Sequence, residues 1–159
     1  MDLVNVAQNQ HGQSYLGFIL DSKDYGLQIL KVNEIIVLPK ITPLPESPYY
    51  LKGVIDLRGQ IIPIIDLRSI LGINPIEHNN KACVVIVKMD VKNSEKLVGF
   101  IVDSVSEVFD ISIDNIEKPQ DFGLGLDDDF LFGIAKTKEK LIMLLNIDNI
   151  TETHDLLSA

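Results

Sequence analysis

Residues 53–67 read GVIDLRGQIIPIIDL, and this stretch decides the fold class. Two apolar runs flank a connection made of only Arg58 and Gly59. Glycine at the second position of such a connection supplies the positive φ that a tight β-hairpin needs. Pro63 lies inside the second run and has no N–H to donate, so we expect an edge or an irregularity near it. The stretch therefore predicts a hairpin whose register is fixed around Arg58.

Similar short runs, rich in Ile and Val and bounded by Gly, Pro, Asn or Asp, occur along the whole chain. Runs of this kind are typical of short strands. We expect strands at residues 14–20, 25–30, 34–38, 53–57, 60–66, 82–88, 96–102, 105–110, 130–135 and 141–147. Helix is expected only in short pieces at residues 67–71, 113–117 and 147–157. The predicted fold class is mainly β.

The chain repeats itself. Residues 26–35 match residues 99–108, and residues 53–67 match residues 133–147, in the same order in both halves. Self-similarity of this kind points to a duplicated structural unit. A unit of roughly 65 residues buries little surface alone, so we expect the two halves to share an interface. The boundary between them is expected in the polar stretch Asn74 to Asn80.

Composition excludes several classes of protein. The net charge of −9 and the pI near 4.7 repel phosphate backbones, and only 6% of residues are aromatic, so a barrel that binds single-stranded nucleic acid is disfavoured. The first residues lack the pattern of an export signal, and no apolar run approaches the length of a membrane span. We therefore expect a cytoplasmic protein. Its mean hydropathy of +0.19 indicates apolar side chains left for partners.

Catalytic and metal-binding patterns are missing from the sequence. His11, His78 and His154 lie far apart, and none has a Cys or a carboxylate at ligand spacing. A hydrolase or transferase would need a cluster of titratable groups in a pocket, which this spacing disfavours. We predict a protein that is not an enzyme, with no catalytic residue, no metal and no cofactor.

The hairpin stretch resembles the signature segment of the CheW family, the coupling proteins of bacterial chemotaxis. The likeness extends to Tyr25-Gly26 and to residues 30–35, 84–87, 98–99, 102–105 and 130–133; Ala135 departs from the family, which often carries glycine there. The resemblance implies one CheW-like domain over residues 12–159, made of two five-stranded β-barrels of the Src-homology type packed side by side. Barrel 1 is expected at about residues 14–73 and barrel 2 at about residues 81–150, and strands near the termini can cross between them.

The resemblance also implies a function and partners. CheW-like proteins are non-catalytic adaptors that couple chemoreceptors to the histidine kinase CheA. The expected partners are the regulatory domain of CheA and the cytoplasmic tips of methyl-accepting chemoreceptors, without nucleic acid and without insertion into a membrane. The alternative is a CheW-like scaffold that serves a kinase pathway other than chemotaxis.

Site residues follow from the resemblance in two groups. A receptor-binding groove between the barrels is expected to involve Ile29, Val32, Glu34, Arg58, Gly99, Val105 and Val108. Contacts with the kinase are expected at Ile41, Lys52 and Val84, and the prolines around Ile41 favour an exposed side chain there.

More than one interpretation remains open for two groups of these residues. Ile29, Val32, Val105 and Val108 could equally be ordinary core. Glu34 and Arg58, whose repeat partners Glu107 and Lys138 carry the same charges, could be separate exposed charges, an ion pair within a barrel, or neighbours of the receptor groove.

Overall fold

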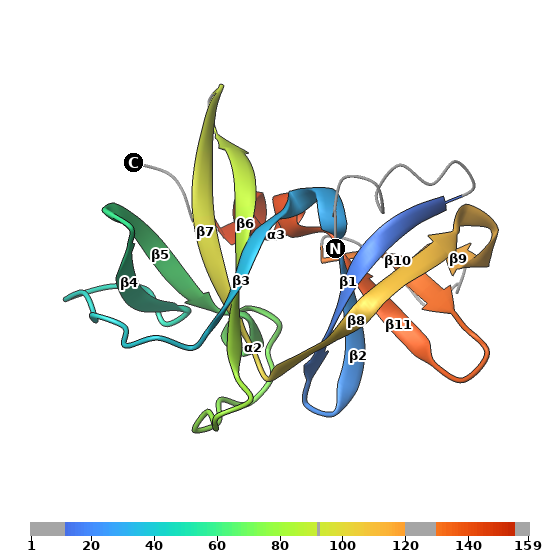
Figure 1. The fold of residues 1–159 in the computed structure, drawn as a ribbon, viewed down its shortest axis with the longest axis horizontal. Helices are drawn as coiled ribbons and strands as arrows, with labels where there is room; N and C mark the ends of the chain where they lie inside the picture. The colour runs from blue at the N-terminus through green and yellow to red at the C-terminus, as the bar shows by residue number, and fades with distance from the viewer. Residues whose placement is uncertain (1–11, 92, 120–129, 155–159) are drawn as a thin grey trace. The chain divides into compact units, whose positions relative to one another are not determined.

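The computed structural model describes residues 12–91, 93–119 and 130–154, and β-strands dominate it (Figure 1). The predicted mainly β fold class is confirmed. Its elements are, in chain order, β1 (Gly12–Leu20), β2 (Lys23–Gln28), η1 (Ile29–Lys31), β3 (Val32–Val37), β4 (Leu51–Leu57), β5 (Gln60–Asp66), α2 (Leu67–Ile70), β6 (Cys83–Val91), β7 (Ser94–Val102), β8 (Ser104–Ser112), η2 (Ile113–Asn115), β9 (Ile116–Glu117), β10 (Leu131–Lys136), β11 (Leu141–Leu145) and α3 (Ile147–His154).

The strands form two sheets, one in each of two compact units. Unit 1 comprises Met1–Leu30 with Ser106–Ala159, and unit 2 comprises Lys31–Val105. The sheet of unit 1 has six strands in the order β8-β1-β2-β11-β10-β9, and that of unit 2 has five in the order β3-β6-β7-β5-β4. β9, with two residues, is the additional strand.

Each sheet curls until its first and last strands meet around a shared core. In unit 2, Ile36 on β3 and Leu57 on β4 pack against the same buried cluster, although these strands lie at opposite ends of the sheet. In unit 1, Phe109 on β8 and Ile116 on β9 do the same. Both units are therefore small barrels, as the resemblance implied.

The hairpin predicted around Arg58 and Gly59 is confirmed. Arg58 and Gly59 both have positive φ, 51° and 86°, as a type I′ turn requires. The strands close at the pair Leu57–Gln60, and the Gly59 N–H donates to the Asp56 Oδ1 at 2.9 Å. The turn thereby fixes the register of β4 and β5.

Pro63 does not lie on an edge strand, because β5 runs between β4 and β7. Counted from the turn, the facing residues of β4 and β5 form hydrogen-bonded and non-hydrogen-bonded pairs in alternation. Val54 and Pro63 form a non-hydrogen-bonded pair. The nitrogen of Pro63 consequently faces away from β4 and toward the side of β5 on which β7 lies. Pairing between β5 and β7 begins only at Ile64, so no bond to β7 is due at Pro63. The proline removes no ladder bond.

The repeat is confirmed by the register of the strands. Gly26 on β2 pairs in parallel with Leu144 on β11, and Gly99 on β7 pairs in parallel with Ile64 on β5. The register between β4 and β5 shifts between Leu51 and Gly53, and that between β10 and β11 shifts at the matching residues 131 and 133. Equivalent residues thus make equivalent pairs in both units.

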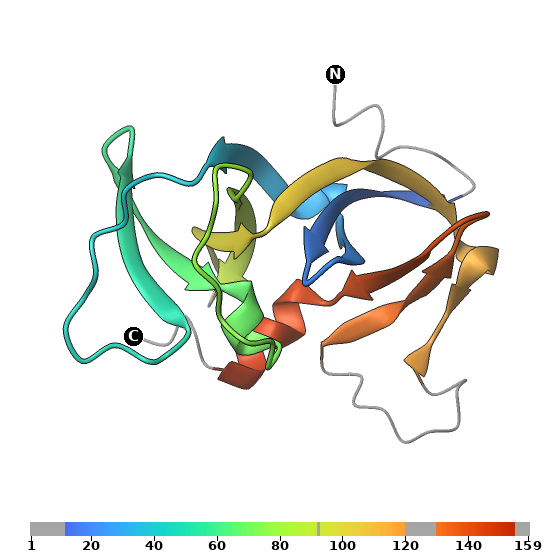
Figure 2. The same ribbon diagram turned by 90° about the horizontal axis from the view of Figure 1, so that it is seen from below.

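The expected division of the chain at residues 74–80 is contradicted. The first hairpin, β1–β2, pairs with β11 instead of with the β4–β5 hairpin of its own repeat, and β6–β7 pairs with β3 and β5 of the first repeat. Figure 2 shows β1 and β2 in blue beside the orange-red β11. The repeats exchange their first hairpins, so that each barrel contains strands of both. Local sequence patterns are the same with or without this exchange, and so they cannot reveal it.

Candidate functional site

Glu34 and Arg58 form an ion pair, which was one of the three alternatives left open by the sequence. Glu34 projects from β3, and Arg58 projects from the turn between β4 and β5. The pair therefore links the two ends of the curled sheet of unit 2. Exposed pairs contribute little to stability, typically about 0–1 kcal/mol, and the guanidinium of Arg58 stays largely exposed. It can therefore still meet a partner.

The matching position of unit 1 is built differently. Among the residues that the structure describes, no ion pair joins Glu107 to Lys138. Lys140, in the turn between β10 and β11, instead lies with its Nζ 3.6 Å from the Asp24 Oδ1 and 5.5 Å from the ring centre of Phe109 on β8. Arg58 in the β4–β5 turn and Lys140 in the β10–β11 turn therefore each contact a residue on the strand at the opposite edge of their own sheet, β3 and β8 respectively.

The four apolar residues expected at the receptor groove fall into two classes. Ile29 in η1 and Val32 at the start of β3 are buried like core residues, whereas Val105 and Val108 on β8 are half-buried. Ile29 and Val32 therefore have the burial expected of ordinary core residues. The groove role stays a prediction for all four.

Two other expected site residues lie in the interior of unit 2. Val84 on β6 is 0% exposed and belongs to the buried cluster. Gly99 is buried on β7, where an added Cβ would lie 2.6 Å from the Ile64 Cδ1 and 2.7 Å from the Val84 Cγ1. Neither residue presents a side chain at the surface of unit 2, and the kinase contact of Val84 and the groove contact of Gly99 stay predictions.

Ile41 is half-buried instead of exposed. Thr42 forms an isolated bridge with Val54, and this bridge holds the segment between β3 and β4 against the barrel. Ile41 consequently packs on the core cluster and lies beside Gly53. Sequence reasoning missed two neighbours that are more exposed, Leu44 and Tyr49, the latter 69% exposed. The prolines of this segment were the signal that pointed to an exposed surface here.

Lys52 has a partner within its own barrel. Its Nζ lies 3.9 Å from the Oδ2 of Asp66, a carboxylate that is only 1% exposed. The other oxygen of Asp66, Oδ1, accepts the backbone N–H of Arg68 at 3.1 Å and caps α2. Lys52 is therefore a counter-charge for a buried anion as well as an exposed cation.

Arg68 forms a buried ion pair that sequence reasoning did not find. Its Nε and NH2 donate to the two carboxylate oxygens of Asp103 at 2.9 and 2.8 Å, and its NH1 donates to the carbonyl of Asn74. Paired bonds of this geometry are strong and directional. The contact ties α2 to the junction between β7 and β8 and to the connection between the repeats.

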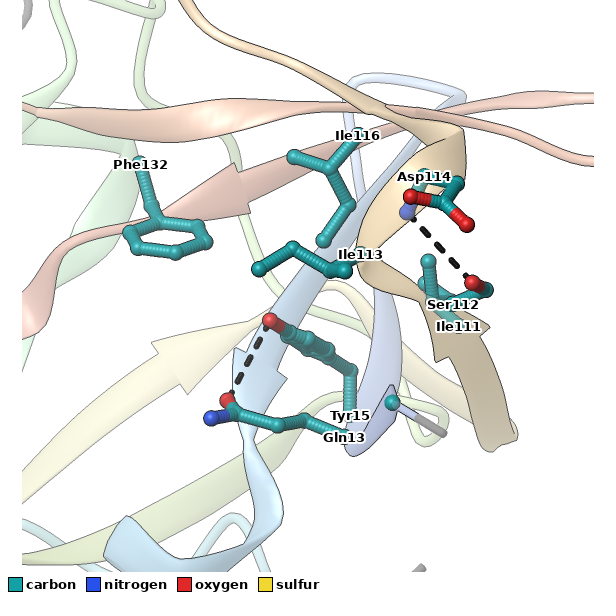
Figure 3. A pocket seen from close by; sticks show the side chains of 9 residues that line it. Gln13, Tyr15, Ile111, Ser112, Ile113, Asp114, Ile116 and Phe132 are labelled. Atoms are coloured by element: carbon teal, nitrogen blue, oxygen red, sulfur yellow. Dashed lines mark hydrogen bonds between the residues drawn. The ribbon is translucent and has the colours of Figure 1, made fainter. Parts of the chain in front are cut away.

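Unit 1 contains an apolar pocket of about 470 Å³ near η2 (Figure 3). Tyr15, Ile111, Ile113, Ile116 and Phe132 provide its apolar lining. The Tyr15 hydroxyl donates to the Oε1 of Gln13 at 3.4 Å. Burial raises the pKa of the Tyr15 phenol, while a hydrogen bond with Gln28 acts in the opposite direction.

Groups of three or more His, Cys, Asp or Glu side chains suited to hold a metal ion do not occur in residues 12–91, 93–119 and 130–154. Within the same part of the chain, no helix is long and apolar enough to cross a membrane.

Two small β-barrels of the Src-homology type, with several large apolar side chains at the surface, define a protein-binding module of the scaffold class. A family profile described as "CheW-like domain" matches residues 14–154. The chain therefore belongs to the CheW-like family. It is a chemotaxis scaffold protein, and members of this family act without catalysis.

Individual relatives agree with this membership. The chain is 30% identical to the chemotaxis protein CheW of Klebsiella aerogenes, over 91% of this chain and 85% of that protein. It is 35% identical to the CheW of Thermotoga maritima, over 86% of each. The crystal structure of the scaffolding protein TtCheW from Thermoanaerobacter tengcongensis superposes with a TM-score of 0.78 at 34% identity, covering 89% of this chain and 93% of that one.

Proposed function

We propose that the protein works in the cytoplasm as an adaptor that couples methyl-accepting chemoreceptors to the histidine kinase CheA. The observation that carries this proposal is the match of the CheW-like domain to residues 14–154. The exposed apolar side chains support it, because a scaffold without chemistry of its own acts through binding surfaces. The regulatory domain of CheA and the cytoplasmic tips of the receptors are the proposed partners.

The kinase surface in this proposal is the segment between β3 and β4 together with the start of β4. It carries Ile41 and Lys52, with Leu44 and Tyr49 exposed between them. Exposed tyrosines are among the residues that most often dominate a binding interface. Tyr49 contacts only Tyr50 among the ring pairs recorded in the described residues, with ring centres 5.3 Å apart, so a partner can reach it.

The kinase proposal is tested by titrating the isolated regulatory domain of CheA into wild type and into the variants Tyr49→Ala and Ile41→Asp. Each change should weaken binding by about 2 kcal/mol, mainly through faster dissociation, as truncation of a hot spot does. Leu141→Ser is the matched control, since Leu141 is equally exposed but lies in unit 1. Unchanged affinity in Tyr49→Ala and Ile41→Asp, with the fold intact by circular dichroism, would remove this segment from the interface.

The receptor surface in this proposal involves Val105, Val108, Glu34 and Arg58, together with the buried residues Ile29 and Val32. Val108→Asp should weaken binding to a receptor-tip fragment while leaving kinase affinity unchanged, because a charge placed in an apolar contact must be desolvated. Retained receptor binding in this variant would refute the assignment of β8. Failure of the wild-type protein to bind either partner would instead favour a scaffold of another kinase pathway.

A further inference from the structure

The net charge of the chain is divided very unequally between the two units. Unit 2 holds nine Lys and Arg residues against eight Asp and Glu, a net charge of +1. Unit 1 holds five Lys and Arg against fifteen Asp and Glu, a net charge of −10. The net negative charge of the chain, −9, therefore comes entirely from unit 1, because unit 2 is slightly positive. A field of this sign raises the rate at which basic partners meet unit 1.

The apolar pocket lies in this acidic unit and is open to partners. Ile113 is 71% exposed, and Phe132, on β10, is partly exposed beside it (Figure 3). Tyr15 and Ile111 are buried and provide the inner wall. A volume of about 470 Å³ exceeds that of a single large side chain and lies in the range of pockets that bind small ligands or peptide anchors.

Acidic residues alternate with the apolar residues of the pocket wall. Asp110, Asp114 and Glu117 are all exposed, and each is a neighbour in sequence of a pocket residue. Asp110 accepts a hydrogen bond at its Oδ1 from the hydroxyl of Ser14 at 2.6 Å, and because these two residues alternate along β8 and β1 with the pocket residues Ile111 and Tyr15, this carboxylate faces the other side of the sheet. The N–H of Asp114 donates to the Ser112 Oγ at 3.4 Å, so its carboxylate is presented from a local turn. Among the lining residues that the structure describes, Asp114 is the one that carries a charge.

The described lysines of unit 1 do not line this pocket. Lys136, Lys138 and Lys140 border a second hollow around the β10–β11 hairpin together with Glu117, and Lys23 lies at the start of β2. Lys118 follows Glu117 directly and makes a contact of its own. The eight residues from Asp110 to Glu117 therefore carry three acids and no base.

We propose that this pocket of unit 1 binds a basic peptide segment of a partner protein. An apolar side chain of that segment enters between Ile113 and Phe132, a flanking Lys or Arg pairs with Asp114, and the acidic field of unit 1 attracts the other basic residues. Apolar burial supplies the affinity, and the acids supply the rate of encounter and the choice of partner. This site is independent of the kinase and receptor surfaces assigned above, which involve none of the residues of its lining.

The proposal is tested on the full-length protein with labelled synthetic pentapeptides, followed by fluorescence anisotropy. Lys-Lys-Leu-Lys-Lys should bind at least about tenfold more tightly than Lys-Lys-Ser-Lys-Lys and than Glu-Glu-Leu-Glu-Glu, a difference of about 1.4 kcal/mol. Ile113→Ser and Phe132→Ala should each abolish the preference for leucine. Asp114→Asn should weaken both lysine peptides and flatten the dependence of their affinity on salt.

Matched controls separate the pocket from general charge. Leu141→Ser and Glu139→Gln remove an apolar residue and an acid at the second hollow, and both should bind the peptides as wild type does. Ile113 is largely exposed, so its loss should not affect folding, which circular dichroism checks. Equal binding of the leucine and serine peptides, tighter binding of the acidic peptide, or unchanged binding in Ile113→Ser would each overturn the proposal.

Discussion

Gly99 illustrates how closely single residues determine the interior of unit 2. Methyl groups of Ile64 and Val84 occupy the space where its Cβ would stand. Gly59 is the opposite case, because nothing lies near its missing Cβ, yet its φ of 86° belongs to the left-handed region. The two glycines are thus required for different reasons, close packing in the first and backbone conformation in the second.

Substitution of these glycines should have separable effects on the free energy of unfolding. Gly99→Val should cost about 3 kcal/mol or more through overpacking, and a second change, Val84→Ala, should restore part of that loss by making room. Gly59→Ala should cost about 1 kcal/mol, and no change at a neighbouring side chain should rescue it. Urea denaturation measures all three variants. No rescue of Gly99→Val by Val84→Ala would mean that Gly99 does not face Val84.

Among the elements, α2 and the β4–β5 hairpin each carry an arginine, but the two arginines differ in their surroundings. Arg68 is buried with Asp103, whereas Arg58 pairs with Glu34 at the surface. Removing one partner of a buried pair leaves an uncompensated charge, which costs about 3–5 kcal/mol, and removing an exposed partner costs about 0–1 kcal/mol. Arg68→Ala should therefore destabilise the protein strongly and Arg58→Ala hardly at all.

Double-mutant cycles measured by urea denaturation check this contrast. Arg68→Ala with Asp103→Ala should be less harmful than the sum of the single changes, because the double variant buries no lone charge. The coupling between Arg58 and Glu34 should fall as salt is added, since exposed pairs are screened. A salt-resistant coupling above about 2 kcal/mol for Arg58 would show that it acts as a structural element of the barrel.

Predictability from sequence also differs between elements. The turn of the β4–β5 hairpin and the bounds of β5 were predicted to the residue, because the turn and the apolar runs are local properties of residues 53–67, whereas β4 begins at Leu51, two residues before the predicted start. The Arg68–Asp103 pair spans 35 residues and carries no local signal. Ile41 was expected to be exposed on account of its prolines, but the bridge from Thr42 to Val54, a contact between distant segments, decided its burial.

At the level of the whole molecule, the exchange of hairpins between the repeats makes the two halves of the chain interdependent. A chain cut between residues 75 and 79 should yield two fragments that do not fold alone, because each barrel needs strands from both. Mixed or produced together, the fragments should copurify and regain the β-sheet circular dichroism of the intact protein. If either fragment alone gave a cooperative unfolding transition, the exchanged pairing would be wrong.

Unit 2 is continuous in sequence, whereas unit 1 is assembled from both ends of the chain. A mechanical load applied between the two termini therefore passes through unit 1 alone for as long as unit 1 is folded. The force reaches unit 2 only after unit 1 has unfolded. The two units must therefore unfold in a fixed order, whatever the relative mechanical stabilities of the barrels. Optical tweezers should record unit 1 extending first in every pull, even in a Gly99→Val variant whose unit 2 is the weaker one.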